Sequence, residues 1–594
     1  TDRVFGMHRK KYCVQLVQSK ELRDEFDFAE KMFREKKVLG SQRALQYGGE
    51  YILKKNERIY NCSSLLVDKV KSFQDTSYLL LAGCGVGFSV QYHHIDKLPD
   101  ISKRSKGLKK FVIPDSVEGW ADAVGILMSS FFIKDVPFPE YIGYNVEFDF
   151  SLIRKKGSLI AGQFKAPGPG PLKKGLDKVE KLINSRLANG QTRLNPIDIY
   201  DCLMHCADFV VSGGLRRAAT IVLFSKTDSD MAKAKTGDWF AVNPQRARSN
   251  NSVVLERKAT TKDEFNKIFE NIRQSGEPGF YFVHDKAGSV VNPCVEIGFW
   301  PILPSGESGV SFCNLVEING KFCDNDRHFF ETCRAASFIG TLQAGYTDFP
   351  YLGKITEEIV RKESLLGVSL TGWMDNPKTL FNKDTLNKGA KICKETNDKF
   401  SKIIGINPAA RITCVKPSGS ASCILGTASG IHPHHSRRYI RNVQVNKQEF
   451  FGKHYKSINP SEVQASVWSA NNSDNVISFL CEVPHGSILK NDLSAIDFLK
   501  KIKYVQEEWV IPGTIPERGL NPTVTHNVSN TVIVKDDEWD LVADFIYNNR
   551  DFFSGVSLLA GSGDLDYRQA PFINVLNDKE LIEKYGDGIL FSSG

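Results

Sequence analysis

The stretch Asn292-Pro293-Cys294-Val295-Glu296 places an amide, a thiol and a carboxylate at alternate positions of the chain. Proline pushes the residue before it out of the helical region, so an extended backbone is predicted here. Side chains two residues apart on an extended backbone point the same way, and the three groups would then converge on one side. The plainer alternative is a loop at a strand end that carries a buried free cysteine.

Length and composition indicate how many domains to expect and the broad class of protein. The chain has 594 residues, more than the roughly 250–300 at which single cores stop growing, so one large unit with appended parts or several domains is expected. With 41% hydrophobic and 25% charged residues, it has the composition of an ordinary soluble protein. The net charge of +8 is spread along the chain, which favours a solvated basic face over a nucleic-acid groove.

Cysteine usage indicates the redox environment. The chain has 13 cysteines without regular spacing and shows no secretory leader, so free thiols in a reducing, cytoplasmic setting are expected. The longest apolar runs are too short to span a bilayer, so no membrane association is expected. The cysteines and histidines at 202–206 and 432–435 lack the paired spacing of a zinc site, and no metal site is predicted.

The order of apolar patterns predicts the fold class. Residues up to about 50 have the periodicity of helices, and apolar helices then alternate with β-rich runs. Strands are expected at 60–67, 219–224, 280–284, 411–414 and 527–534, with helices at 119–132, 198–211 and 263–273. This alternation predicts an α/β architecture with mainly parallel pairing.

Three further patterns suggest chemistry, and each has a structural alternative. Gly85-Val86-Gly87 follows a predicted helix, which is the wrong context for a dinucleotide fingerprint, and close backbone packing explains it equally well. Cys62, Cys294 and Cys313 are either core fillers or one reactive sulfur with a dithiol pair. The hydroxyls and backbone N–H groups of 416–422 suit a phosphate or form an ordinary capped turn.

A set of motifs gains meaning from its order along residues 40–570. The motifs are Asn61-Cys62-Ser63, Gly85 to Val90, Ser212 to Arg217, Asn250 to Val253, Gly276 to Gly279, Asn292 to Glu296, Lys416 to Ser420, Gly430 to Pro433 and His526 to Asn530. Together they resemble the ribonucleotide reductases, specifically the adenosylcobalamin-dependent (class II) type and its single-chain ribonucleoside-triphosphate reductase branch.

The resemblance implies a ten-stranded α/β barrel with the catalytic cysteine on a finger loop inside it. The expected organisation is an N-terminal helical segment at 1–50, a catalytic barrel at 51–545 and a C-terminal segment at 546–594. An insertion at 91–150 would contribute to an effector site, which favours a monomer over a dimer.

The resemblance also implies a role for each matching residue. Cys294 would form the thiyl radical that removes the ribose 3′ hydrogen, Glu296 would accept the 3′-hydroxyl proton, and Asn292 would hold the ribose. Cys62 and Cys313 would protonate the departing 2′-hydroxyl and deliver two electrons, ending as a disulfide.

Binding sites for substrate and effector follow from the same matching. The residues expected to bind substrate are Asn61, Ser63, Pro417, Ser418, Gly419, Ser420, Ala421 and Ser422. The residues expected to bind a deoxynucleotide effector are Asp68, Asp115, Arg154, Gly162, Gln163 and Lys165. The implied cofactor is adenosylcobalamin, and the implied electron donor is an external thioredoxin-like dithiol.

The sequence departs from the family pattern in places. Val295 replaces the usual glycine after the catalytic cysteine, and Ser420 stands where threonine is usual. The last cysteine is Cys481, so the cysteine pair of the family's tail either lies outside this chain or is replaced by another reductant. A catalytic subunit with a separate radical-generating partner and a non-catalytic nucleotide sensor are the alternatives, and di- versus triphosphate specificity stays open.

Overall fold

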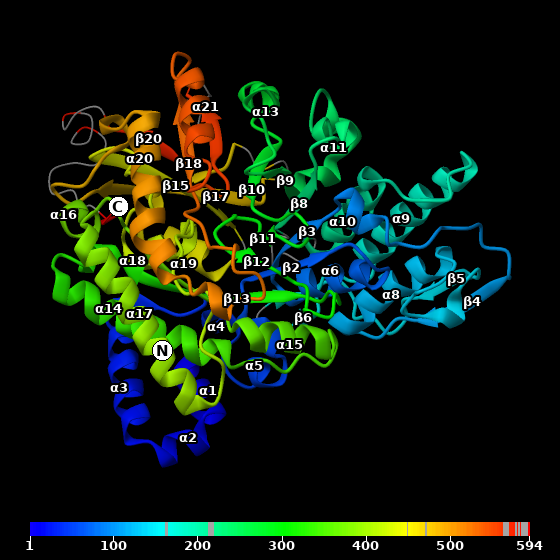
Figure 1. Cartoon of the computed structure of the whole chain (residues 1–594), viewed down its shortest axis with the longest axis horizontal. Helices are drawn as coiled ribbons and strands as arrows, with labels where there is room; N and C mark the ends of the chain where they lie inside the picture. Colours follow the sequence, from blue (N-terminus) through cyan, green and yellow to red (C-terminus); the bar gives the residue numbers. More distant parts are fainter. Residues whose placement is uncertain are drawn as a thin grey trace.

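The computed structural model describes residues 1–594 except 161–163, 212–218, 448, 468, 470–471, 562–568, 576–578, 580–582, 584–591 and 594. A mixed sheet lies at the centre of the molecule (Figure 1). Its strand order is β1-β13-β2-β3-β8-β9-β10, and β14 pairs with β13. The bounds are β1 (Val38–Leu39), β2 (Cys62–Leu66), β3 (Gly85–Ser89), β8 (Thr220–Ser225), β9 (Ser249–Glu256), β10 (Gly279–Val283), β13 (Ser311–Asn319) and β14 (Leu366–Thr371).

The sheet consists of two parallel halves. Strands β2, β3, β8, β9 and β10 run parallel to one another, and β13 is parallel to β14. The halves meet where β13 runs antiparallel to β2, with Cys313 opposite Cys62. The predicted α/β architecture with mainly parallel pairing is confirmed.

Hydrogen bonds continue beyond the sheet on both sides. On one side, Thr413 forms a parallel bridge with Val368 of β14, and Val415 forms one with Val528. Next along the chain, β18 (Thr531–Val534) pairs in parallel with β19 (Ser557–Ala560). On the other side, Phe282 N of β10 donates to Ser554 O at 2.7 Å. The sheet therefore curls, and the segments after β14 approach its far edge.

Helices connect the parallel strands, because a parallel pair needs a crossover connection. The connecting and covering helices are α6 (Lys71–Ala82), α10 (Pro196–Val211), α11 (Ser229–Ala232), α12 (Trp239–Val242), α13 (Lys262–Ser275), α14 (Asp326–Ala344), α15 (Lys354–Glu363), α16 (Pro377–Leu380), α17 (Lys383–Ile404), α20 (Ala495–Val505) and α21 (Trp539–Asn548). Local sequence fixes their ends: α13 begins with a Thr261–Glu264 capping box and ends before Gly276, whose φ is 73°.

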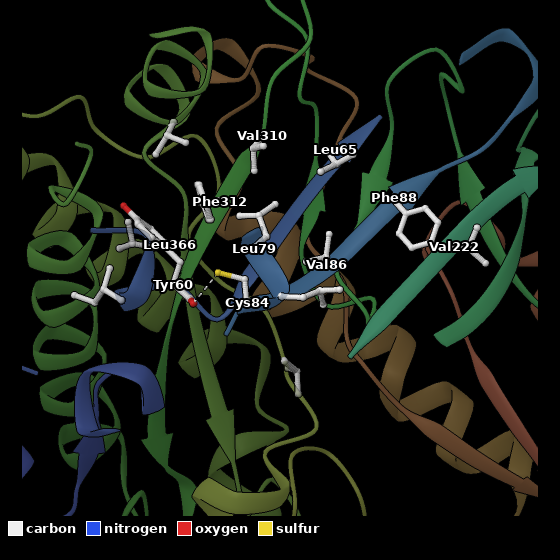
Figure 2. Close-up of a cluster of buried hydrophobic side chains, with 14 of the residues drawn as sticks. Tyr60, Leu65, Leu79, Cys84, Val86, Phe88, Val222, Val310, Phe312 and Leu366 are labelled. Atoms are coloured by element: carbon white, nitrogen blue, oxygen red, sulfur yellow. Dashed lines mark hydrogen bonds between the residues drawn. The ribbon is translucent and has the colours of Figure 1, made fainter. Parts of the chain in front are cut away.

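The sheet separates two apolar cores, because neighbouring residues of a strand face opposite sides. In β8, Val222 packs in the large core beneath the helices, whereas Ile221 and Leu223 pack in a smaller core on the inner face. Figure 2 shows part of the large core, with Val86, Phe88 and Val222 on neighbouring strands. The inner core contains Cys62, Cys313 and Cys414.

Two groups of elements from the N-terminal part of the chain flank the central sheet. The first is α1 (Asp2–Lys11), α2 (Cys13–Gln18), α3 (Lys20–Arg34), α4 (Gln42–Tyr47) and α5 (Glu50–Lys54). Phe26 of α3 packs edge-on against Phe338 of α14 at 5.3 Å between ring centroids. The second group is α7 (Tyr92–Ile95), β4 (Leu108–Val112), α8 (Val117–Phe131), β5 (Asn145–Asp149), β6 (Leu159–Ile160), β7 (Phe164–Lys165) and α9 (Gly170–Ala188).

A second sheet follows in the C-terminal part, and the sequence patterns did not predict it. Its order is β16-β17-β15-β20, with β21 beside β17. The elements of this region are α18 (Gly419–Leu425), β15 (Arg438–Asn446), α19 (Phe450–Ile458), β16 (Val463–Ala465), β17 (Asp474–Glu482), β20 (Phe572–Asn574) and β21 (Ser592–Ser593). Within the described part of the chain, no helix has both the length and the apolar character needed to cross a membrane.

Candidate active site

The Asn292 to Glu296 stretch lies at the tip of a β-hairpin. Strands β11 (Val290–Val291) and β12 (Gly298–Phe299) pair antiparallel and frame it. The predicted extended backbone is wrong: Asn292 O accepts a hydrogen bond from Val295 N at 2.9 Å, and Val295 has a φ of 63°. The Asn292 side chain stabilises this turn, since its Oδ1 accepts from Ile297 N at 3.0 Å.

Glycines make room for this hairpin. A Cβ on Gly87 of β3 would lie 1.6 Å from Val291 O, and one on Gly85 would lie 3.2 Å from Pro293 Cγ. From β9, Asn250 Nδ2 donates to Pro293 O at 2.9 Å. The Gly85-Val86-Gly87 pattern therefore reflects close packing against the hairpin.

Asn292, Glu296 and Cys62 form a buried cluster. Asn292 Nδ2 donates to Glu296 Oε2 at 2.7 Å and to Cys62 Sγ at 3.2 Å. Cys62 Sγ lies 4.0 Å from Glu296 Oε1. Burial raises the pKa of Glu296, while the Asn292 hydrogen bond and Lys416 oppose the rise. The turn thus brings the predicted amide and carboxylate together although it is not extended.

Cys313 faces Cys62 across the two strands. The two residues are directly opposite in the antiparallel ladder, where Cα atoms lie about 4.5–5.5 Å apart. That separation falls within the range of disulfides. Burial raises the pKa of both thiols, so both are protonated at neutral pH.

Cys294 differs from the other cysteines of the inner face because its side chain is exposed. Protein atoms nevertheless surround the thiol closely enough to desolvate it. This desolvation, followed by the negative charge of Glu296, raises its pKa well above the ordinary thiol value. Cys294 is therefore an accessible, protonated thiol.

The predicted phosphate-binding segment begins α18. Ser418 precedes the helix with a φ of 55°, and its hydroxyl donates to Glu317. Gly419 and Ser420 are exposed at the first turn, whereas Ala421 and Ser422 are buried. The Ser418 side chain is thus held by the protein, and Gly419 and Ser420 are the accessible residues of this turn.

The remaining predicted substrate residues lie beside Cys62 in sequence. Ser63 is adjacent to Cys62 in β2 and so faces the opposite side of the sheet, and its hydroxyl donates to Gly85 O at 3.2 Å. Asn61 Oδ1 accepts a hydrogen bond from Ser41 at 2.6 Å. The structure does not bring Ser63 to the face that carries Cys62.

The predicted effector residues fall into separate groups. Arg154 Nε donates to Asp115 Oδ2 at 2.6 Å, whereas Asp68 Oδ1 accepts from Ser308 at 2.8 Å. Lys165 ends β7, and Gly162 and Gln163 lie outside the described residues. The motif from Ser212 to Arg217 also lies outside them.

Two charged residues near the cluster had no predicted role. Lys416 Nζ lies 2.8 Å from Glu317 Oε2, and both side chains are largely buried. Glu317 is four residues after Cys313 in β13 and so shares its face. The even spacing between Cys313 and Glu317 is the feature of the sequence that could have pointed to Glu317.

Comparison with a solved structure identifies the fold. A solved structure described as B12-dependent (class II) ribonucleotide reductase superposes with a TM-score of 0.82 and 19% identity, covering 100% of this chain and 91% of that one. This similarity establishes the fold, a mixed α/β architecture with a curled sheet. No family model matches the chain.

Sequence comparison identifies particular relatives. A probable adenosylcobalamin-dependent ribonucleoside-triphosphate reductase of Dictyostelium discoideum is 27% identical, over 67% of this chain and 52% of its own length. The adenosylcobalamin-dependent ribonucleoside-triphosphate reductase of Lactobacillus helveticus is 25% identical, over 66% and 60%. The one from Euglena gracilis is 26% identical, over 70% and 58%. The resemblance to class II ribonucleotide reductases is thus confirmed, and the chain spans little more than half the length of these relatives.

Proposed function

We propose that this chain reduces ribonucleotides, as triphosphates, to 2′-deoxyribonucleotides by thiyl-radical chemistry. The observation that carries the proposal is the accessible Cys294 thiol on a hairpin whose Asn292 and Glu296 contact Cys62, with Cys313 directly opposite. Relatives named adenosylcobalamin-dependent ribonucleoside-triphosphate reductase support the substrate and the cofactor.

In the proposed mechanism, each residue acts on one part of the ribose. The Cys294 thiyl takes the 3′ hydrogen, which is reversible because S–H and ribose C–H bonds are similar in strength. Glu296 accepts the 3′-hydroxyl proton as general base, and Asn292 hydrogen-bonds to the ribose. Cys62 and Cys313 supply two electrons and two protons: the 2′-hydroxyl leaves as water, the 2′ carbon gains hydrogen, and the sulfurs form a disulfide. The Cys294 thiol then returns the hydrogen atom to the 3′ carbon, which regenerates the thiyl radical, and Glu296 returns the proton to the 3′ oxygen.

The exposed side chain of Cys294 fits a radical-generating cofactor, because it is the inner-face thiol that a bound group can reach. When bound, adenosylcobalamin supplies the radical chemistry that removes the hydrogen atom from this thiol. The protein holds Cys294 on a turn braced by Asn250 and by the Asn292 side chain. An external thioredoxin-like dithiol would then reduce the cysteine pair again.

We further propose that the curled sheet closes into a ten-stranded barrel. Its strands would be β2, β3, β8, β9, β10, the segment of Ser554 with β19, β18, the segment 411–415, β14 and β13. The bridges of Thr413 and Val415 and the Phe282 to Ser554 hydrogen bond support this closure. Since β19 lies beyond residue 545, the catalytic unit in this proposal extends to residue 560.

The ligand sites complete the proposal. Substrate phosphates would bind at the start of α18, where Gly419 and Ser420 are accessible. A deoxynucleotide effector would bind at the insertion 91–150, with Asp115 and Arg154 as contributors. That insertion would allow the protein to act as a monomer.

An anaerobic assay tests this function. CTP and CDP reduction would be measured with a dithiol, with and without adenosylcobalamin. We expect CTP reduction that requires the cofactor, complete loss of product in Cys294→Ser, and full activity in the control Cys13→Ser, whose cysteine is exposed on α2. Peptide mapping after turnover without reductant should link Cys62 to Cys313. Activity that needs a second protein instead of cobalamin, or turnover by Cys294→Ser, would refute the proposal.

A further inference from the structure

A buried ion pair lies beside the proposed general base. Lys416 Nζ is 2.8 Å from Glu317 Oε2, with side-chain exposures of 10% and 1%. Glu317 belongs to β13, on the same face as Cys313. Burying two charges is expensive, so a pair in this position suggests a role other than stability.

The protein fixes both members of this pair. Glu317 Oε1 accepts hydrogen bonds from the hydroxyls of Ser418 and Ser369. Ser369 Oγ, in turn, accepts a hydrogen bond from Lys416 N at 3.0 Å. Hydrogen bonds therefore fix both the Glu317 carboxylate that pairs with the ammonium group and the backbone of Lys416.

Backbone hydrogen bonds link the segment of Lys416 to Glu296. Asn527 N donates to Glu296 O at 2.9 Å, and Asn527 O accepts from Val415 N at 3.2 Å. Glu296 is thus connected through one residue to the residue that precedes Lys416. Burial would lower the pKa of Lys416, but Glu317 and then Glu296 raise it, so the ammonium stays charged at neutral pH.

The charges around Glu296 act in opposite directions. Burial favours its neutral acid, which cannot accept a proton, and Glu317 adds repulsion. Asn292 and Lys416 favour the carboxylate. The titratable and charged groups that face this centre are Cys294 on its own loop, Cys62 on β2, Cys313 and Glu317 on β13, and Cys414 and Lys416 on the segment after β14.

We infer that Lys416, anchored by Glu317, is a positioning residue that keeps the Glu296 carboxylate ready to accept a proton. The inference deepens the proposed function and rests on it, because Glu296 is the base in that mechanism. Lys416 acts through Glu296 and takes no part in bond making.

Two substitutions should move the pH profile in opposite directions. The base works only when ionised, so kcat/KM falls as pH drops through the pKa of Glu296. Lys416→Met removes a stabilising cation and should move this acid limb to higher pH, by about one unit. Glu317→Gln removes a repelling anion and should move it to lower pH. Lys416→Arg keeps the charge and should restore a limb close to that of the wild type.

Opposite shifts separate this role from a structural one. Both Lys416→Met and Glu317→Gln break the buried pair, so both should lower the melting temperature. The control Lys402→Met, at an exposed position on α17, should change neither the melting temperature nor the limb. Acid limbs that do not move, or that move the same way in both variants, would overturn the inference. A raised KM with an unmoved limb would overturn it too, since Lys416 would then bind substrate phosphate.

An infrared titration tests the inference without turnover. The carboxyl band of Glu296 is the one missing in Glu296→Gln, and its titration midpoint should rise in Lys416→Met and fall in Glu317→Gln. An inactive wild-type protein would refute the proposed function, and this titration would still decide the role of Lys416. Unchanged midpoints would refute that role.

Discussion

Replacing Gly87 by alanine tests whether close packing holds the reactive hairpin in place. Gly87 lies in β3, and its φ is outside the left-handed region. Alanine therefore causes no backbone strain, and its whole effect is steric. The added Cβ would lie 1.6 Å from Val291 O and 2.8 Å from Val291 C.

The magnitude follows from that overlap. Contacts to Cβ below 3.0 Å are essentially never seen, so the hairpin or the strand must move by roughly 1.4 Å in a closely packed interior. Overpacking of this kind costs about 1–3 kcal/mol of stability. A displacement of about 1 Å at a reacting group lowers rates about 100-fold. Gly87→Ala should therefore lose at least about two orders of magnitude in turnover while the protein still folds.

The assay combines nucleotide reduction with thermal unfolding. Gly6→Ala is the matched control, because Gly6 lies in α1 with no atom within 4 Å of the added Cβ. Alanine at that exposed helical position should stabilise the protein by about 0.5–1 kcal/mol and leave activity unchanged. Wild-type turnover and melting temperature in Gly87→Ala would refute the packing argument.

Three further predictions concern stability, measured by denaturant unfolding. Val295→Gly should be more stable than Val295→Ala by about 1 kcal/mol, reversing the usual order, because only glycine relieves the φ of 63°; the usual order would contradict this. Arg411→Met should cost about 3–5 kcal/mol by leaving the buried Glu363 unpaired, and Arg411→Met/Glu363→Leu should recover most of it; equal losses would argue against a coupled pair. Burial lowers the pKa of His526 to about 3, so the unfolded chain binds this proton more readily than the folded protein, and the free energy of unfolding should fall by about 2 kcal/mol between pH 6.5 and 5. In His526→Gln the free energy of unfolding should depend less on pH over this range, and an unchanged dependence would exclude the contribution of His526.

Two strands of the parallel part were predictable from the sequence because most of their residues are apolar on both faces. Thr220–Ser225 and Gly279–Val283 agree within a residue with the predicted strands 219–224 and 280–284. Such strands read as continuous apolar runs. By contrast, β15 mixes charged and polar residues and is half-buried, so its place in an antiparallel sheet depends on partners distant in sequence.

Sequence reasoning named the cysteines of the candidate site but not the local geometry around them. The resemblance named Cys62, Cys294 and Cys313, and the structure places Cys62 and Cys313 opposite each other. The turn at the hairpin tip was missed because it depends on the Asn292 side chain bonding to the backbone of Ile297. Neither secondary-structure propensity nor the alternation of polar and apolar residues predicts such a hydrogen bond.

The antiparallel junction between β2 and β13 has a mechanical consequence. It joins the two parallel halves of the sheet, and the proposed redox pair bridges it. A disulfide between Cys62 and Cys313 would cross-link the two halves and close a loop of some 250 residues. The closed loop lowers the entropy of the unfolded chain, and this raises the free energy of unfolding by about 5 kcal/mol at most. The junction would then be cross-linked in the oxidised protein and not in the reduced protein. The melting temperature would therefore indicate what fraction of the molecules is oxidised.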